Sequence, residues 1–177
     1  MNNYLQNIIK SMKMLASNKK TIFLGQSVTY PGSLIYETLK SIPNNKKIEL
    51  PVLEEVQMGM SIGLALEGYI PITCYPRFDF LILALNQLIN HADKIDHLTN
   101  DEFKSKIIVR TLIGATKPLD AGPQHTQDYT EGLKKMLRFT KVIKLEKNSN
   151  ILNLYKSSLT DKKNKIFLFI EDSNLYN

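Results

Sequence analysis

Six short apolar segments alternate with helical patterns along this chain, and this alternation constrains the fold more than any other feature. Strands are predicted at residues 21–25, 48–50, 70–75, 106–112, 141–145 and 166–171. Helices are predicted at residues 3–17, 33–42, 79–97, 130–137 and 150–159, together with a glutamate-led helix within residues 51–68. Parallel strands need crossovers of this kind, and right-handed crossovers cover both sheet faces with helices. We therefore expect an α/β fold, a three-layer, doubly wound, mostly parallel sheet of about six strands.

Composition excludes several classes of protein. The chain has 177 residues, of which 43% are hydrophobic, so we expect one domain over residues 1–177, with an N-terminal helix in 1–20 and the α/β core in 21–177. The net charge of +6 comes from lysines that are scattered or lie in short turns, which does not predict nucleic-acid binding. No apolar run is long enough to span a bilayer, and we expect no membrane association.

The single cysteine, Cys74, lies in a predicted strand. One cysteine cannot form an intramolecular disulfide, and this suits a reducing compartment. We expect a cytoplasmic protein in which Cys74 is a small buried hydrophobic residue.

Carboxylates open the otherwise apolar helix of residues 51–68. The unpaired backbone N–H groups of a first helical turn favour Glu54 and Glu55 there. From the local sequence, a role in starting the helix explains the two residues as well as a functional role does. Gly59 and Gly63 follow four residues apart, although each glycine costs about 1 kcal/mol relative to alanine inside a helix. Such glycines accompany close approach of another backbone or a ligand, and ordinary helix packing inside the domain is the alternative.

The histidines are too dispersed to predict a metal site. His91 and His97 fall on or just after the long predicted helix and receive no chemical role. His125 lies in an irregular segment after the fourth predicted strand, where functional side chains gather in such folds, although a surface histidine is the alternative. The generic nucleotide, metal and hydrolase motifs are absent from the sequence.

Five segments, taken in order, resemble one known family. They are residues 22–26, 51–68, 79–94, 109–111 and 122–127. Together they are similar to the pyrimidine-binding domain of transketolase-like thiamine-diphosphate enzymes, most closely the beta subunit of the decarboxylase component of pyruvate and branched-chain 2-oxo acid dehydrogenases. The resemblance runs from about residue 21 to residue 177.

The resemblance implies that Glu54 hydrogen-bonds the protonatable ring nitrogen of the aminopyrimidine of thiamine diphosphate. Sharing that proton favours the tautomer that deprotonates the thiazolium carbon, and apolar neighbours would strengthen the effect. Val52, Leu53, Val56 and Met58 are the residues expected to supply that apolar surface.

Four further residues take their expected roles from the same resemblance. Phe80 would stack against the pyrimidine ring, although a core phenylalanine at a helix start is the alternative. His125 would face the substrate side of the cofactor as a second catalytic residue. Tyr30 and Gln26 are weaker candidates for lining the cofactor pocket.

The sequence also departs from the family pattern. The family subunit carries a second, C-terminal domain that this sequence lacks, and no segment resembles the Gly-Asp-Gly…Asn motif that holds the diphosphate and Mg²⁺. We therefore expect no metal ligands in this chain and a separate diphosphate-binding, alpha-type partner in a heterodimer or heterotetramer, without which the chain is inactive. Arg77 stands where the family usually has an uncharged residue. It would meet a substrate carboxylate or an acidic partner, or be a solvated or salt-bridged surface arginine.

The expected function is that of the pyrimidine-binding subunit of a split enzyme. It would supply Glu54 for decarboxylation of a small 2-oxo acid, followed by oxidation or by transfer of the activated aldehyde. A non-catalytic interaction or regulatory subunit that kept the fold, a transketolase-type half-enzyme and a fragment of a longer chain are the alternatives.

Overall fold

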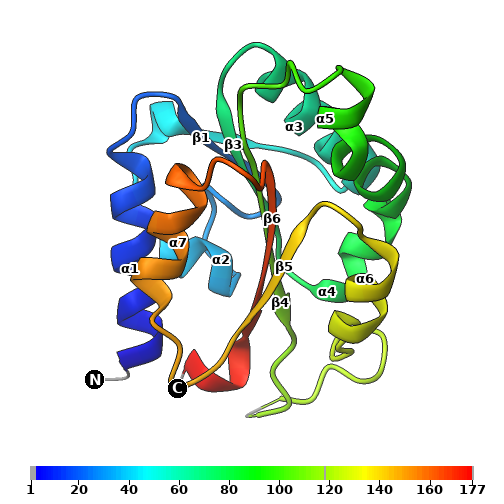
Figure 1. The fold of residues 1–177 in the computed structure, drawn as a ribbon. Coiled ribbons are helices and arrows are strands. Elements are labelled where there is room, and N and C mark those ends of the chain that lie inside the picture. The colour runs from blue at the N-terminus through cyan, green and yellow to red at the C-terminus, as the bar shows by residue number, and fades with distance from the viewer. Residues whose placement is uncertain (1–2, 118, 177) are drawn as a thin grey trace.

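The computed structural model describes residues 3–117 and 119–176 and is built on one parallel sheet (Figure 1). Its six strands lie in the order β2-β1-β3-β4-β6-β5, and all neighbouring pairs are parallel. They are β1 (Thr21–Gly25), β2 (Lys47–Glu49), β3 (Ile70–Tyr75), β4 (Ile107–Ile113), β5 (Lys141–Leu145) and β6 (Ile166–Asp172). The strands β4 and β6 are buried almost throughout, as strands covered on both faces should be.

Helices cover both faces of the sheet and make it a three-layer structure (Figure 1). One face carries α1 (Asn3–Ala16), α2 (Leu34–Leu39) and α7 (Ile151–Thr160). The other carries α3 (Glu54–Leu66), α4 (Phe78–Leu81), α5 (Ile95–Leu98) and α6 (Thr130–Met136). Each layer has its own buried cluster, centred on Phe23, Phe167 and Phe169 on the first face and on Val109, Leu168 and Phe78 on the second. The predicted α/β class, parallel sheet and layer arrangement are confirmed.

The long helix predicted at residues 79–97 is wrong as a single α-helix. Between α4 and α5 the chain forms a 3₁₀ turn at Ile82–Ala84, a π-helical segment at Gln87–His91 and a second 3₁₀ turn at Ala92–Lys94. The spacing of apolar residues predicts which side of a helix is buried, but not whether each N–H bonds three, four or five residues back. Leu88 and Ala92 are accordingly fully buried despite the irregular winding.

A buried ion pair joins the neighbouring strands β4 and β6. Glu171 and Arg110 are both inaccessible, and the carboxylate accepts hydrogen bonds from Arg110 Nε at 2.7 Å and Nη2 at 2.9 Å. The hydroxyls of Tyr155, at 2.7 Å, and Tyr176 donate to the same carboxylate. This network ties the sheet to α7 and to the 3₁₀ turn of Ser173–Tyr176.

The strand order places a ligand-binding edge between β1 and β3, where the direction of winding reverses. In open parallel sheets, ligands bind beyond the carboxyl ends of the strands at such a point. Gly25 ends β1 with φ of 147°, and an added Cβ there would overlap the carbonyl oxygen of Cys74 on β3. In the described part of the chain, no helix is both long and apolar enough to cross a bilayer.

Candidate functional site

Glu54 begins α3 directly above the carboxyl edge of the sheet. Its side chain is only 5% exposed, and Oε1 accepts a hydrogen bond of 2.9 Å from Nε2 of Gln26, in the loop after β1. Tyr75, at the end of β3, donates its hydroxyl to the main-chain oxygen of Glu54 at 3.2 Å. Within residues 3–117 and 119–176, no donor reaches Oε2 of Glu54. The carboxylate is therefore held on one side and open to a ligand on the other.

Glu55 differs from its neighbour. It is exposed, and its carboxylate accepts a hydrogen bond of 3.3 Å from Asn86 at the surface. An exposed acidic residue in a first helical turn is fully explained by the helix dipole. The geometry therefore favours Glu54 over Glu55 as the functional carboxylate.

The apolar surroundings expected for Glu54 are mostly not present in the isolated chain. Val52, Leu53 and Val56 are 71%, 51% and 52% exposed, and only Met58 is buried. Val52 and Leu53 precede α3, and Val56 lies in its first turn. This part of the expectation is corrected: the apolar residues form an exposed surface beside the carboxylate rather than a pocket around it.

Phe80 and His125 come together although they are 45 residues apart in the sequence. Their rings meet edge to face, with centroids 5.5 Å apart and an interplanar angle of 83°. Phe80 is half-buried, whereas its neighbours Phe78 and Leu81 are fully buried, so Phe80 lies outside the core. Nδ1 of His125 is buried and has no hydrogen-bond partner among the described residues.

The path of the loop that carries His125 depends on Gly114, which follows β4. An added Cβ at Gly114 would overlap both the carbonyl oxygen of His125 and Nη1 of Arg77. Arg77 Nη1 in turn donates to that carbonyl oxygen at 3.3 Å. Glycine at residue 114 is therefore what lets the histidine loop lie against the end of β4.

A cavity of about 500 Å³ opens at this edge, between the loop after β1 and the turn from β3 into α4. Gln26, Arg77 and Phe80 are among its lining residues. Glu54 adjoins it through Gln26, and His125 adjoins it through Phe80. Of the five predicted site residues, two therefore line the cavity and two contact one of the lining residues. The fifth, Tyr30, is 66% exposed and is not among the lining residues.

Sequence reasoning missed Glu49, which shapes the cavity wall. Its carboxylate accepts hydrogen bonds from the backbone N–H groups of Ser27, Val28 and Thr29, the last two at 2.8 and 2.7 Å. Ser27 has a positive φ of 54°, a conformation that this bonding supports. Glu49 ends a short edge strand, and no local pattern distinguishes it from a solvated surface residue.

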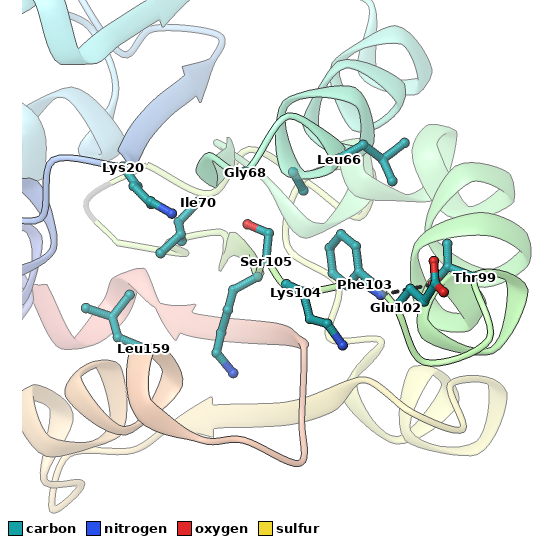
Figure 2. Close-up of a pocket in the computed structure, with 12 residues that line it drawn as sticks. Lys20, Leu66, Gly68, Ile70, Thr99, Glu102, Phe103, Lys104, Ser105 and Leu159 are labelled. Carbon is teal, nitrogen blue, oxygen red and sulfur yellow. Dashed lines mark hydrogen bonds between the residues drawn. The ribbon is translucent and has the colours of Figure 1, made fainter.

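A second cavity, of about 470 Å³, lies at the opposite ends of the strands, and its lining includes a lysine with a structural role. Figure 2 shows Lys20, Ser105 and Leu159 around it. Lys106 lines the same cavity and donates from Nζ to the main-chain oxygens of Asn164, at 2.7 Å, and Asp161. Burial lowers the pKa of Lys106. These bonds anchor the start of β4 to the turn between α7 and β6.

Two smaller expectations can also be compared with the structure. Cys74 is fully buried, and burial raises the pKa of its thiol to about 11, so it behaves as the predicted small hydrophobic residue. In the two described stretches of chain, no three His, Cys, Asp or Glu side chains gather to form a metal-binding group.

The chain is similar to known proteins over most of its length. No family model matches the chain. It is 29% identical over 165 residues to the pyruvate dehydrogenase E1 component subunit beta of Gracilaria tenuistipitata var. liui, which covers 90% of this chain and 49% of that protein. It is 26% identical over 171 residues to the subunit of the same name from Rhizobium meliloti (strain 1021), covering 92% and 35%. The chain thus spans about half or less of the length of these curated relatives.

A solved structure shares the fold. It is described as a split gene transketolase, inactive beta4 tetramer, and it matches with a TM-score of 0.56 and 14% identity over 95% of this chain and 50% of that one. The predicted resemblance to beta subunits of this enzyme group is confirmed, as is the three-layer fold.

Proposed function

We propose that this chain is the pyrimidine-binding, beta-type subunit of a thiamine-diphosphate-dependent enzyme that decarboxylates a 2-oxo acid. The observation that carries the proposal is Glu54, a carboxylate that is 5% exposed, held through Oε1 by Gln26 and left open at Oε2. Oε2 is therefore the oxygen of this carboxylate that a hydrogen-bond donor of a ligand can reach.

The residues at this edge fit the aminopyrimidine half of the cofactor. When bound, thiamine diphosphate would supply a nucleophilic thiazolium carbon for addition to the 2-oxo group and a thiazolium ring to take up the electron pair left when CO₂ departs. Oε2 of Glu54 would share a proton with the pyrimidine ring nitrogen, and the hydrogen bond from Gln26 to Oε1 would fix the orientation of the carboxylate. Phe80 offers a half-buried ring for stacking, and His125, which packs against Phe80, would face the substrate side of the cofactor.

The exposed surface next to Glu54 is suited to contact with a partner subunit. Leu53, Val56 and Met60 are exposed and lie along one side of the start of α3. Gly59 and Gly63 belong to the same helix, and an added Cβ at either would meet nothing within 4 Å. Packing inside the domain therefore does not explain these glycines. An apolar helix face with open glycines allows close approach of another backbone, which we assign to the diphosphate-binding, alpha-type subunit that would hold the diphosphate and Mg²⁺.

The relatives support this arrangement, since each is named as the beta subunit of an E1 component. Oxidation or transfer as the step after decarboxylation stays open within the proposal, as does a heterodimer or a heterotetramer. A cytoplasmic location remains a prediction from the single, unreactive Cys74.

The proposal is tested by co-expressing the chain with an alpha-type, diphosphate-binding subunit. We expect the pair to copurify, to bind thiamine diphosphate in the presence of Mg²⁺, and to exchange the thiazolium C2 proton quickly by NMR. Glu54→Gln should slow that exchange by at least tenfold, because a neutral amide cannot share the ring proton. Glu55→Gln is the matched control on the neighbouring, exposed residue. Undiminished exchange and turnover in Glu54→Gln would sink the assigned role, and a pair that assembles without binding the cofactor would make this chain a scaffold.

A further inference from the structure

Arg77 lies where a ligand in the candidate site would meet it. It precedes α4 at the carboxyl end of β3, is half-buried, and lines the 500 Å³ cavity together with Gln26 and Phe80. One arm of its guanidinium donates to the main-chain oxygen of His125 at 3.3 Å. This bond holds the Arg77 side chain against the loop that carries His125.

The positive charge of Arg77 has no counter-ion in the described part of the chain. The ion pairs found there involve other residues, so a salt-bridged surface arginine is not the explanation. Glu37 also lines the cavity, but its side chain is exposed and its charge is screened by water. A half-buried guanidinium facing a cavity favours an anionic occupant, because its planar fork pairs with carboxylate or phosphate oxygens.

The chemistry of decarboxylation decides which anionic group this is. The carboxylate next to the 2-oxo group loses its charge when its C–C bond breaks and it departs as CO₂. An arginine bound to that carboxylate would stabilise the substrate more than the transition state and would slow the reaction. A group that keeps its charge throughout is bound equally before and after, and binding it raises affinity and selectivity without this penalty.

We infer that Arg77 forms an anion subsite that selects 2-oxo acids carrying a second anionic group, a carboxylate or a phosphate-like group, at the end remote from the reaction. The inference rests on the proposed function for its reaction, but the subsite itself is a property of this chain. It assigns a use to the one cation among the residues that line the cavity.

Chemical modification of arginine tests the anion subsite in the absence of the cofactor. The chain contains three arginines, of which Arg110 is fully buried and Arg138 is exposed, so a dicarbonyl reagent such as phenylglyoxal should modify only Arg77 and Arg138. We expect 2-oxoglutarate or 3-phosphonopyruvate to slow modification of Arg77 at least fivefold, pyruvate to have much less effect, and Arg138 to be unaffected. The stronger of the two dianions identifies the kind of group preferred. Equal protection by pyruvate, or no protection of Arg77 in either the chain or its complex, would overturn the inference.

A kinetic test follows in the complex with the alpha-type subunit. The ratio of kcat/KM for 2-oxoglutarate to that for 2-oxopentanoate, which has the same length and an uncharged end, should fall at least tenfold in Arg77→Gln, mainly through KM for 2-oxoglutarate. Arg77→Lys should recover part of the preference, because it keeps the charge but not the fork. Arg138→Gln, with the same change in net charge, should leave the ratio as it is. An unchanged ratio in Arg77→Gln contradicts the subsite, whereas failure to bind thiamine diphosphate, measured without substrate, contradicts the proposed function.

Discussion

Replacing Glu171 by glutamine leaves Arg110 charged in the middle of the fold with no counter-ion. Both side chains are fully inaccessible, and the carboxylate accepts from Nε and Nη2 of Arg110 and from the hydroxyls of Tyr155 and Tyr176. Burial alone would lower the pKa of Arg110, but the Glu171 carboxylate raises it well above its ordinary value, so the arginine stays charged. Glutamine has nearly the same shape, but it offers one acceptor in place of two and carries no charge.

The expected cost is about 3–5 kcal/mol, the usual penalty for removing one member of a buried ion pair. This is a large part of the roughly 5–15 kcal/mol by which a domain of this kind is stable. With a urea m-value of about 2 kcal/mol/M, the unfolding midpoint of Glu171→Gln should fall by roughly 1.5–2.5 M. Urea titrations followed by circular dichroism at pH 7 measure this shift directly.

The double variant Arg110→Met with Glu171→Leu separates the charge from the packing. It removes both charges together, so it should be more stable than Glu171→Gln even though Tyr155 and Tyr176 still lose their acceptor. A midpoint shift below about 0.5 M in Glu171→Gln would refute the reasoning, because the buried arginine would then have found another partner. A double variant as unstable as the sum of its two single changes would refute it as well.

Three further outcomes are expected. Gly114→Ala should destabilise the chain by about 1–3 kcal/mol in urea melts and shift the NMR signals of His125, because the new methyl group overlaps that residue's carbonyl oxygen. Gly59→Ala and Gly63→Ala should each stabilise the isolated chain by up to about 1 kcal/mol and yet weaken its binding to the partner at least tenfold, measured by calorimetry. Above about pH 10 the free energy of unfolding should fall with pH, and Tyr176→Phe should reduce that slope by about 1.4 kcal/mol per pH unit.

The pH prediction follows from the direction of the shift. Burial raises the pKa of Tyr176 well above its ordinary value, and the charge of Glu171 raises it further. The folded chain therefore keeps the phenolic proton while the unfolded chain releases it, so stability is complete below the unfolded pKa and is lost as pH rises through the folded one. A slope that Tyr176→Phe leaves as it was would contradict this account.

Matched changes test the two glycine predictions. Gly132→Ala is the control for Gly114→Ala, because a methyl group at residue 132 meets nothing within 4 Å inside α6 and should be neutral or stabilising. If Gly59→Ala and Gly63→Ala bind the partner as tightly as the unaltered chain, the glycine face of α3 is not the contact surface.

Local sequence pattern predicts all six strands to within one residue. The ranges 21–25, 70–75 and 141–145 agree with β1, β3 and β5 to the residue. The strands predicted at 48–50 and 106–112 are displaced by one residue from β2 and β4, and the strand predicted at 166–171 ends one residue before β6 does, because the last ladder hydrogen bonds and not the apolar pattern define the ends of a strand. The irregular winding between α4 and α5 is set by hydrogen bonding, to which apolar spacing is insensitive.

Contacts between side chains also differ in how far the sequence predicts them. Glu54 and Gln26 are site candidates because they lie in segments that resemble a known family. Both follow predicted strands, and the parallel topology brings their side chains together. Arg110 and Glu171 were not predicted as a pair. They lie 61 residues apart on neighbouring strands, and their contact depends on a register that no local pattern encodes.

In the proposed complex, the exposed apolar side chains beside Glu54 would link completion of the site to binding of the partner subunit. In the isolated chain, water reaches Val52, Leu53 and Val56, and it therefore also surrounds the approach to the carboxylate. A partner that covers these residues removes this water and lowers the local dielectric, which strengthens any hydrogen bond that Oε2 of Glu54 then makes. In the proposed complex, hydrophobic burial would drive the association, and the same burial would bring the carboxylate into the environment that the proposed chemistry requires. Function at Glu54 should accordingly depend on the contact between subunits rather than on the stability of this domain alone.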